Sequence, residues 1–217
     1  MEEWLTIIQR TRLPLYNLVQ RIIPISGVGV EIGCGSAAFA ATLSKQAAVQ
    51  HITCIDNSAD RLKEAELFFT PNLGGNAKKL SFIQADFHSL PFSDHTLDFV
   101  LADAALHHTE DLPTLLTEIK RVLKPTGTLV AAREPILPSL LPLKLWRKFW
   151  FGWRQRLRGD TECTHTKQEW IDHFDGAGFK LQLQPSTVPT TLKEKIVHAF
   201  ARYNGILFGR YILIATQ

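Results

Sequence analysis

Short apolar runs alternate along the chain with longer segments in which apolar residues recur every three or four positions. The runs at 27–32, 51–56, 80–85, 97–102 and 128–132 are bounded by glycine or polar turns, which is typical of buried strands. Strands that alternate with helices in this way indicate βαβ units and a mostly parallel sheet covered on both faces. We therefore predict a doubly wound α/β fold.

Helix signals fall between these runs, and two late apolar runs, 179–183 and 211–215, complete the strands. The signals are apolar stripes, N-terminal caps and glycine stops. The predicted helices are 4–22, interrupted at Pro14; 36–45; Asn57 or Ser58 to about Phe69; Asp111 to near Leu123, with Pro113 in the first turn; Thr166, which opens a capping box with Glu169, to Gly176; and a stretch near 191–202.

Length and composition fit a single domain over 1–217, with an N-terminal helical segment over 1–25. The chain has 217 residues, of which 45% are hydrophobic and 21% charged, so wholesale disorder is excluded. No segment approaches the roughly 18 apolar residues of a membrane span. The start lacks the basic residues of a signal peptide, and three cysteines show neither disulfide nor zinc spacing. We expect a cytoplasmic protein.

Positive charge is concentrated in one segment, although the net charge of +3 argues against a nucleic acid partner. A basic aromatic insertion over 135–165 has six basic residues and no acidic one between Lys144 and Arg158. On a helical wheel, residues 143–158 place aromatic and basic side chains on opposite sides. Three interpretations stay open: a helix that covers the core, a lid over a substrate, or peripheral contact with the inner face of a membrane.

A glycine turn marks the passage from the first strand to its helix. Gly33-Cys34-Gly35 is followed by Ala38 in a dinucleotide-type pattern, and such glycines let a ligand approach the backbone closely. Asp56 ends the second strand and can accept from ribose hydroxyls. Asp86 ends the third and can accept from an exocyclic amine, with Phe87 against a purine. Because carboxyl ends of parallel strands form ligand sites, the set predicts an adenosine-containing cofactor.

Six stretches of the chain carry the motifs of a known family: Val30 to Ser36, Ile55 to Ser58, Ala85 to Phe92, Leu97 to Val100, Ala105 to His108 and Ile119 to Gly127. Through them the sequence resembles the class I S-adenosylmethionine-dependent methyltransferases, and among these the small-molecule branch of the ubiquinone and menaquinone C-methyltransferases. The resemblance covers about 28–134 and, loosely, Glu169 to Phe179. It departs from the pattern at Ala37, where the third glycine is usual, and at Thr126 within the usual Pro-Gly-Gly.

The resemblance implies a Rossmann-like, seven-stranded sheet with an antiparallel C-terminal strand, and S-adenosylmethionine as the cofactor. Gly33 and Gly35 would pass under its methionine part, which Ala37 would approach with one extra methyl, and Glu31 would support the loop. The other implied roles are Asp56 on the ribose, Asp86 on the adenine amine, Phe87 on the ring, and Ala102 with Asp103 near the sulfonium; Cys34 and Asn57 complete the implied set of cofactor contacts.

Methyl transfer from a sulfonium is an in-line displacement in which alignment supplies most of the catalysis. A base helps only if the acceptor must lose a proton, and the candidates are His108 first, then His107, Asp103 and Glu134. The expected acceptor is a small molecule, lipophilic if it resembles a quinone precursor, and no metal site is predicted. Two other functions stay open: a Rossmann-type NAD(P)-dependent oxidoreductase, and a catalytically silent methyltransferase fold that only binds.

Overall fold

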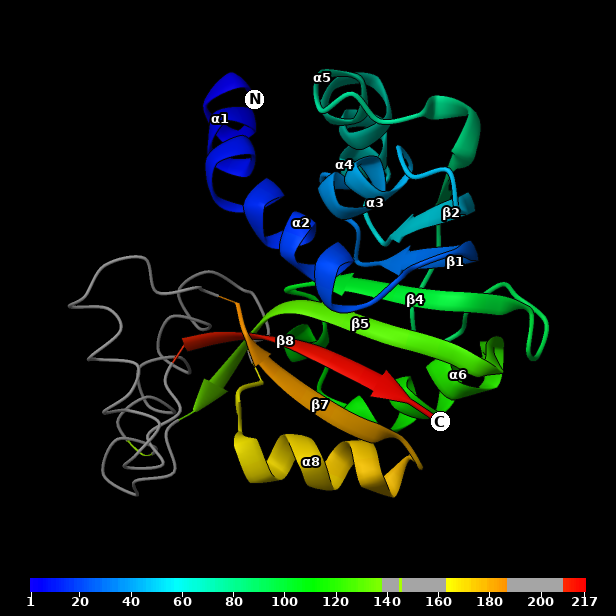
Figure 1. The fold of residues 1–217 in the computed structure, drawn as a ribbon, viewed down its shortest axis with the longest axis vertical. Coiled ribbons are helices and arrows are strands. Elements are labelled where there is room, and N and C mark those ends of the chain that lie inside the picture. The colour runs from blue at the N-terminus through cyan, green and yellow to red at the C-terminus, as the bar shows by residue number, and fades with distance from the viewer. Residues whose placement is uncertain (138–144, 146–162, 187–208) are drawn as a thin grey trace.

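One sheet organises the part of the chain that the computed structural model describes, residues 1–137, 145, 163–186 and 209–217 (Figure 1). Within these residues the sheet has eight strands in the order β3-β2-β1-β4-β5-β8-β7, and β6 pairs with β5 beside this path. The strands are β1 (Gly27–Ile32), β2 (Val49–Asp56), β3 (Leu80–Gln84), β4 (Leu97–Asp103), β5 (Leu123–Leu137), β6 (His165–Thr166), β7 (Lys180–Pro185) and β8 (Gly209–Thr216).

The predicted fold class is confirmed, with one strand more than expected. β8 runs antiparallel to both of its neighbours, and the other described pairs are parallel. Seven strands form the main path, and the two-residue β6 is the addition. A dinucleotide-binding fold would continue with a parallel strand beside β5, so the antiparallel β8 separates this sheet from that architecture.

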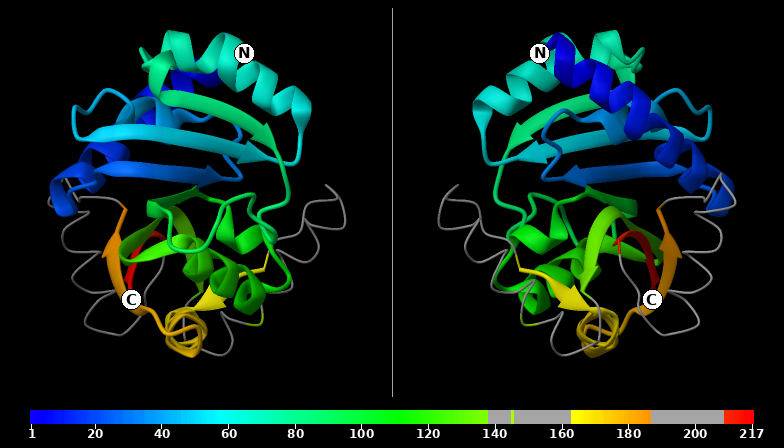
Figure 2. Two further views of the ribbon diagram at one scale, coloured as in Figure 1. Left: turned by 90° about the vertical axis from the view of Figure 1, so that its right-hand side faces the viewer. Right: turned by 90° about the vertical axis from the view of Figure 1, so that its left-hand side faces the viewer.

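Helices cover both faces of the sheet, as the two side views show (Figure 2). The first face carries the helices that precede β3, and the second carries α6 and α8. The helices are α1 (Glu2–Thr11), α2 (Leu13–Ile22), α3 (Ala38–Leu43), α4 (Ala59–Glu64), a π turn (Ala65–Phe69), α5 (Thr70–Asn72), α6 (Leu112–Val122) and α8 (Lys167–Gly176), with 3₁₀ turns at Ala77–Lys79 and Leu106–His108.

Alternating side chains of the central strands fill two separate cores. Leu101 of β4 packs in the core under α2 and α3, whereas its neighbours Val100 and Ala102 pack in the core over α6 and α8. Successive residues of a strand point to opposite faces, and here both faces are covered. This is why the central strands are continuous apolar runs rather than alternating ones.

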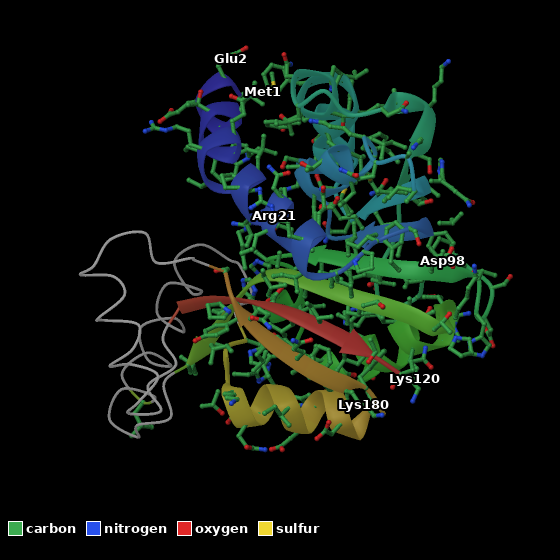
Figure 3. All side chains as sticks on the ribbon, in the orientation of Figure 1. Met1, Glu2, Arg21, Asp98, Lys120 and Lys180 are labelled. Carbon is green, nitrogen blue, oxygen red and sulfur yellow. The ribbon has the colours of Figure 1, made fainter. Side chains whose placement is uncertain are left out.

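The amino ends of the central strands are tied together by Asp98, which lies at the right-hand edge of the sheet in Figure 3. Its carboxylate accepts hydrogen bonds from the Val28 backbone N–H at 2.9 Å and from Lys124 Nζ at 2.7 Å. These contacts join β1 to β4 and β4 to β5 at one edge. The opposite edge, at the carboxyl ends of the strands, is where the loops of the candidate site gather.

Most predicted boundaries agree with the structure to within two residues. Ser58, rather than Asn57, caps α4, and both halves of the capping box between Thr166 and Glu169 are formed. β5 is much longer than the predicted 128–132, because it pairs with β8 and β6 well beyond that run. The helix expected as far as Phe69 changes to a π turn at Ala65.

Two predicted segments lie outside the described residues. The helical stretch near 191–202 is entirely outside them, and of the basic aromatic insertion over 135–165 only its ends and Leu145 are described. The three interpretations of residues 143–158 therefore stay predictions. In the described parts of the chain, no helix combines the length and the apolar character that crossing a bilayer requires.

Gly29→Ala tests the close approach of β1 to β4. A Cβ at position 29 would overlap the Phe99 ring and lie 2.5 Å from the Phe99 carbonyl oxygen, so backbone would have to move. We expect the free energy of unfolding to fall by about 2–3 kcal/mol in urea denaturation. Gly176→Ala is the control, because a Cβ there meets nothing within 4 Å. If Gly29→Ala lowered the free energy of unfolding no more than Gly176→Ala does, the close contact of Gly29 with Phe99 would be contradicted.

Candidate functional site

A cleft of about 790 Å³ opens at the carboxyl edge of the sheet. The loops after β1, β2, β3, β4 and within β5 border it, together with α1 and α4. Eight of the thirteen candidate site residues named from the sequence line this cleft: Gly33, Cys34, Gly35, Asp56, Asn57, Phe87, Asp103 and His108. The other five, Glu31, Asp86, Ala102, His107 and Glu134, are not among its lining residues.

The glycine turn forms the floor of the cleft with exposed backbone. Gly33 and Gly35 have φ angles of 58° and 50°, the left-handed region that glycine adopts without strain. A Cβ on Gly35 would meet no atom within 4 Å, so open space lies above this residue. Ala37 also has a left-handed φ of 50°, but it is buried in the first core. The expectation that its methyl approaches the ligand is therefore wrong.

Asp56 holds the glycine turn in place. One carboxylate oxygen accepts a hydrogen bond from the Gly35 N–H at 2.9 Å, and the other accepts from the Ser58 N–H at 3.0 Å. The side chain is nearly buried and still lines the cleft. A carboxylate has about four lone-pair positions, so these two bonds leave acceptor capacity that could face a ligand's hydroxyls.

Glu31 lies beneath the cleft rather than in its wall. Its Oε2 accepts from the Ala40 N–H at 2.7 Å and thereby ties β1 to the start of α3. Its Oε1 is buried and has no hydrogen-bond partner among the described residues. Burial raises the pKa of Glu31 to about 8, so the carboxyl group is protonated at neutral pH. The predicted supporting role agrees with this position.

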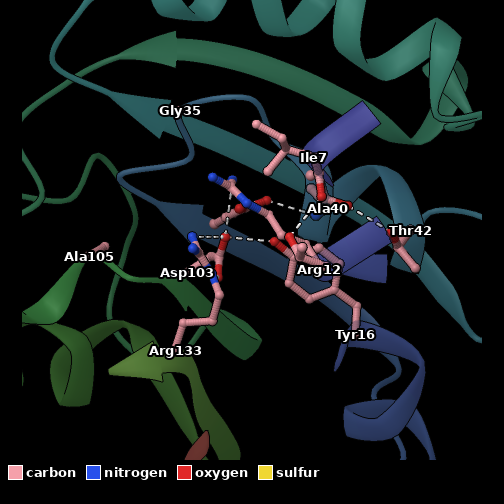
Figure 4. A network of polar contacts seen from close by, with 12 residues as sticks. Ile7, Arg12, Tyr16, Gly35, Ala40, Thr42, Asp103, Ala105 and Arg133 are labelled. Carbon is pink, nitrogen blue, oxygen red and sulfur yellow. Dashed lines mark hydrogen bonds and ion pairs between the residues drawn. The ribbon is translucent and has the colours of Figure 1, made fainter. Parts of the chain in front are cut away.

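Asp103 is the centre of a polar network in the cleft wall (Figure 4). Arg133 donates to both of its oxygens, from Nε at 2.6 Å and Nη2 at 2.7 Å. The buried Tyr16 hydroxyl donates to Oδ2 at 2.6 Å, and burial together with this carboxylate raises the pKa of Tyr16. Arg12 Nη1 is 3.6 Å from Oδ2. With its oxygens engaged in this way, Asp103 is a structural anchor and a poor candidate for the base.

Glu134 is fully buried and caps the 3₁₀ turn after β4. Its carboxylate accepts from the backbone N–H groups of Ala105, Leu106 and His107 at 3.0–3.2 Å. His107 Nδ1 lies 2.7 Å from the same carboxylate, which keeps the ring in the protein interior. The geometry therefore gives Glu134 and His107 positioning roles and leaves His108, the exposed neighbour that lines the cleft, as the candidate base.

The loop after β3 brings Phe87 to the cleft, whereas Asp86 is not among the lining residues. Asp86 Oδ1 accepts from the His88 backbone N–H at 2.9 Å and lies 3.0 Å from His88 Nδ1. These contacts hold the pKa of Asp86 below its usual value, and its side chain is 70% exposed. His88 Nε2 lies 2.7 Å from Thr109 Oγ1, which links this loop to the turn that carries His108.

Several lining residues were not identified from the sequence. Trp4 and Arg12 come from the N-terminal helices, and Arg133 comes from β5. Arg133 has a left-handed φ of 61° where the β5–β8 register is irregular, and such bulges re-aim side chains. No local motif marks these three positions. In the described residues, no group of three or more His, Cys, Asp or Glu side chains could hold a metal ion.

Comparison with known proteins gives a domain match and several relatives. Residues 30–131 match the family model described as "Methyltransferase domain". The chain is 32% identical over 114 residues to the mitochondrial arginine-hydroxylase NDUFAF5 of Danio rerio. This match covers 52% of this chain and 32% of the relative. The chain is 30% identical over 124 residues to the uncharacterized methyltransferase Mb0092 of Mycobacterium bovis, with 57% and 58% covered.

Solved structures share the fold over nearly the whole chain. The crystal structure of YcgJ from Bacillus subtilis has a TM-score of 0.71 at 20% identity, and the match covers 94% of this chain and 97% of that one. This likeness supports the Rossmann-like fold and not a particular reaction. The two curated relatives are matched over about a third and over somewhat more than half of their own lengths.

Glu31→Gln tests the buried protonated carboxyl group. Folding raises its pKa from 4.5 to about 8, so the folded state binds the extra proton and stability falls as pH rises through that window. Glutamine does not titrate, so its free energy of unfolding lacks this decrease. Relative to the wild type, the stability of the variant should rise with pH between about pH 5 and pH 8, by at most about 1.4 kcal/mol per pH unit. The control is Glu66→Gln at an exposed position. If Glu31→Gln and the wild type had the same dependence of unfolding free energy on pH in urea, the raised pKa of Glu31 would be contradicted.

Glu134→Ala tests the cap of the 3₁₀ turn. The change leaves three backbone N–H groups and the His107 ring without their buried acceptor. We expect a loss of about 3–5 kcal/mol in the free energy of unfolding, because several buried hydrogen-bonding groups lose their shared acceptor at once. The exposed Glu110→Ala should change it by less than about 0.5 kcal/mol. A loss below about 1 kcal/mol at position 134 would show that the turn does not depend on this carboxylate.

Proposed function

We propose that this chain, whose residues 30–131 match the methyltransferase-domain family, is a class I S-adenosylmethionine-dependent methyltransferase that transfers a methyl group from this cofactor to a small acceptor. The observation that carries the proposal is the cleft at the carboxyl edge of the sheet. It combines an open glycine floor, a nearly buried carboxylate at Asp56 and an aromatic wall at Phe87.

The residues present fit the cofactor. The open space above Gly35 leaves room for a ligand against the backbone. Asp56 has unused acceptor capacity for ribose hydroxyls, and Phe87 offers an apolar surface to the adenine ring. Asp86 contacts His88 through Oδ1 only, so its exposed Oδ2 keeps acceptor capacity for the adenine amine. Ala102 supports this region from the buried end of β4.

The cofactor, when bound, supplies a methyl group on a positively charged sulfur. The chain's own contribution is to align the acceptor and to keep water out, since alignment accounts for most of the rate of such a displacement. We assign removal of an acceptor proton to His108, which lines the cleft. Glu134 and His107 position its turn from below.

We propose further that the acceptor is lipophilic. Trp4, Phe69 and Phe87 line the cleft, so part of its wall favours an apolar molecule. Contact of residues 143–158 with a membrane surface in the cytoplasm would bring such an acceptor to the protein, and it stays a prediction because these residues lie outside the described part, Leu145 apart.

A second reaction at the same cleft is favoured by one relative. The zebrafish protein that matches this chain is named an arginine-hydroxylase, so a match to the family leaves the reaction itself to be established. A protein of this fold that binds the cofactor without catalysing a reaction also stays open as a function. All of these share cofactor binding, which is therefore the first property to measure.

Calorimetric titration with S-adenosylmethionine and S-adenosylhomocysteine tests the proposal. We expect the wild type to bind both and to give no heat with NAD⁺. Asp56→Asn should weaken binding of both ligands by about 10–100-fold, since it removes a charged acceptor. The control Asp60→Asn changes an exposed carboxylate in the first turn of the next helix, α4, and should leave affinity unchanged.

Absence of binding to the folded wild type would overturn the proposal. Equal affinities for the Asp56 and Asp60 variants would remove Asp56 from the site while leaving the cofactor assignment in place.

A further inference from the structure

We propose that Arg12, at the junction of α1 and α2, binds the carboxylate of the amino-acid part of the methyl donor. The inference rests on the proposed function and adds a ligand-binding residue outside the matched domain at 30–131. The juxtaposition that carries it is a nearly buried guanidinium in the wall of the cleft, beside a carboxylate whose oxygens are already engaged.

The hydrogen-bonding capacity of Arg12 is largely unused. Its side chain is only 11% exposed, yet it lines the cleft. Its closest carboxylate contact, Asp103 Oδ2, is 3.6 Å away, which is an ion pair but too long for a hydrogen bond. The guanidinium also lies 4.6 Å from the Trp4 ring centre, a contact with the ring face that uses none of its N–H groups. A guanidinium has five N–H donors, and a nearly buried one needs acceptors.

Asp103 cannot meet this need, because other donors occupy it. Arg133 donates to both oxygens, and Tyr16 donates to Oδ2 as well. Figure 4 shows these side chains and Arg12 converging on the one carboxylate, next to the loop that carries Gly35. Two guanidinium groups thus share a single negative charge.

A second carboxyl group that acts on Arg12, Glu31, is neutral at pH 7 because burial raises its pKa to about 8. Within the contacts of Asp103, two guanidinium groups therefore share the charge of one carboxylate. A ligand carboxylate would supply a second negative charge and would match the planar fork of the guanidinium, which pairs well with two oxygens at once.

The position of Arg12 selects the end of the donor that it would meet. Asp56 and Phe87 mark the adenosyl end in the proposed function, whereas Arg12 shares the cleft wall with Asp103 and the glycine loop. The amino-acid end of S-adenosylmethionine carries the molecule's only carboxylate. Arg12 lies beside Asp103 in this wall and has both the charge and the unused donors to receive it.

The test compares two ligands that differ in the carboxylate alone. S-adenosylhomocysteine has it, and its decarboxylated analogue, S-adenosyl-3-thiopropylamine, keeps the adenosine, the sulfur and the amine. Kd values are measured by calorimetry for the wild type, Arg12→Met, Arg12→Lys and the control Arg10→Met, which removes an exposed arginine of α1. Circular dichroism establishes that each variant is folded.

We expect Arg12→Met to weaken binding of S-adenosylhomocysteine by about 10–100-fold and to change binding of the analogue by less than about threefold. Arg12→Lys keeps the charge but not the planar guanidinium. Its affinity for S-adenosylhomocysteine should lie between those of Arg12→Met and the wild type. Arg10→Met should behave as the wild type with both ligands.

Two outcomes would overturn the inference. Equal weakening of both ligands by Arg12→Met would mean that Arg12 only supports the wall through Asp103 and Trp4. Unchanged affinity for both would mean that its ligand is elsewhere, for example an anionic acceptor. Failure of the proposed function is distinguishable, because the wild type would then bind neither ligand.

Discussion

The hydrogen bond from the Gly35 N–H to Asp56 joins the loop after β1 to the end of β2, and the cleft depends on it. A turn between a strand and a helix leaves backbone N–H groups without partners, and a carboxylate on the neighbouring strand supplies the acceptor. The same arrangement recurs where Glu31 receives the Ala40 N–H and where Glu134 receives three N–H groups of the next loop. Acidic residues at strand ends therefore shape the site before any ligand binds.

The sheet could be predicted from the sequence because both of its faces are buried. Continuous apolar runs such as Phe99 to Ala102 leave little ambiguity about which segments form central strands. Caps such as Ser58 and Asp111 could also be predicted, because the side chain and the N–H that it accepts from are only three residues apart. The length of β5 was missed, since it follows from pairing with β8, a contact between residues far apart in the chain that no local pattern records.

The site was predicted in part, and the division has a physical basis. Gly33, Gly35 and Asp56 belong to one strand-turn-helix unit and its neighbouring strand, so their spacing carried the information. Arg12 and Arg133 come from an N-terminal helix junction and a bulge in β5, and only the folded chain brings them to Asp103. Glu134 and His107 looked like reactive groups in the sequence, but burial and mutual hydrogen bonding make them supports.

The central place of β8 has a consequence for how the molecule is made. Its residues pair on one side with Leu129 and Val130 of β5 and on the other with Leu181 to Gln184 of β7. During synthesis on the ribosome, the edges of β5 and β7 that pair with β8 have no partner strand until residues 209–216 emerge. Unpaired strand edges are prone to aggregation. The half of the sheet formed by β1 to β4 needs none of these residues, so nascent chains would order that half first.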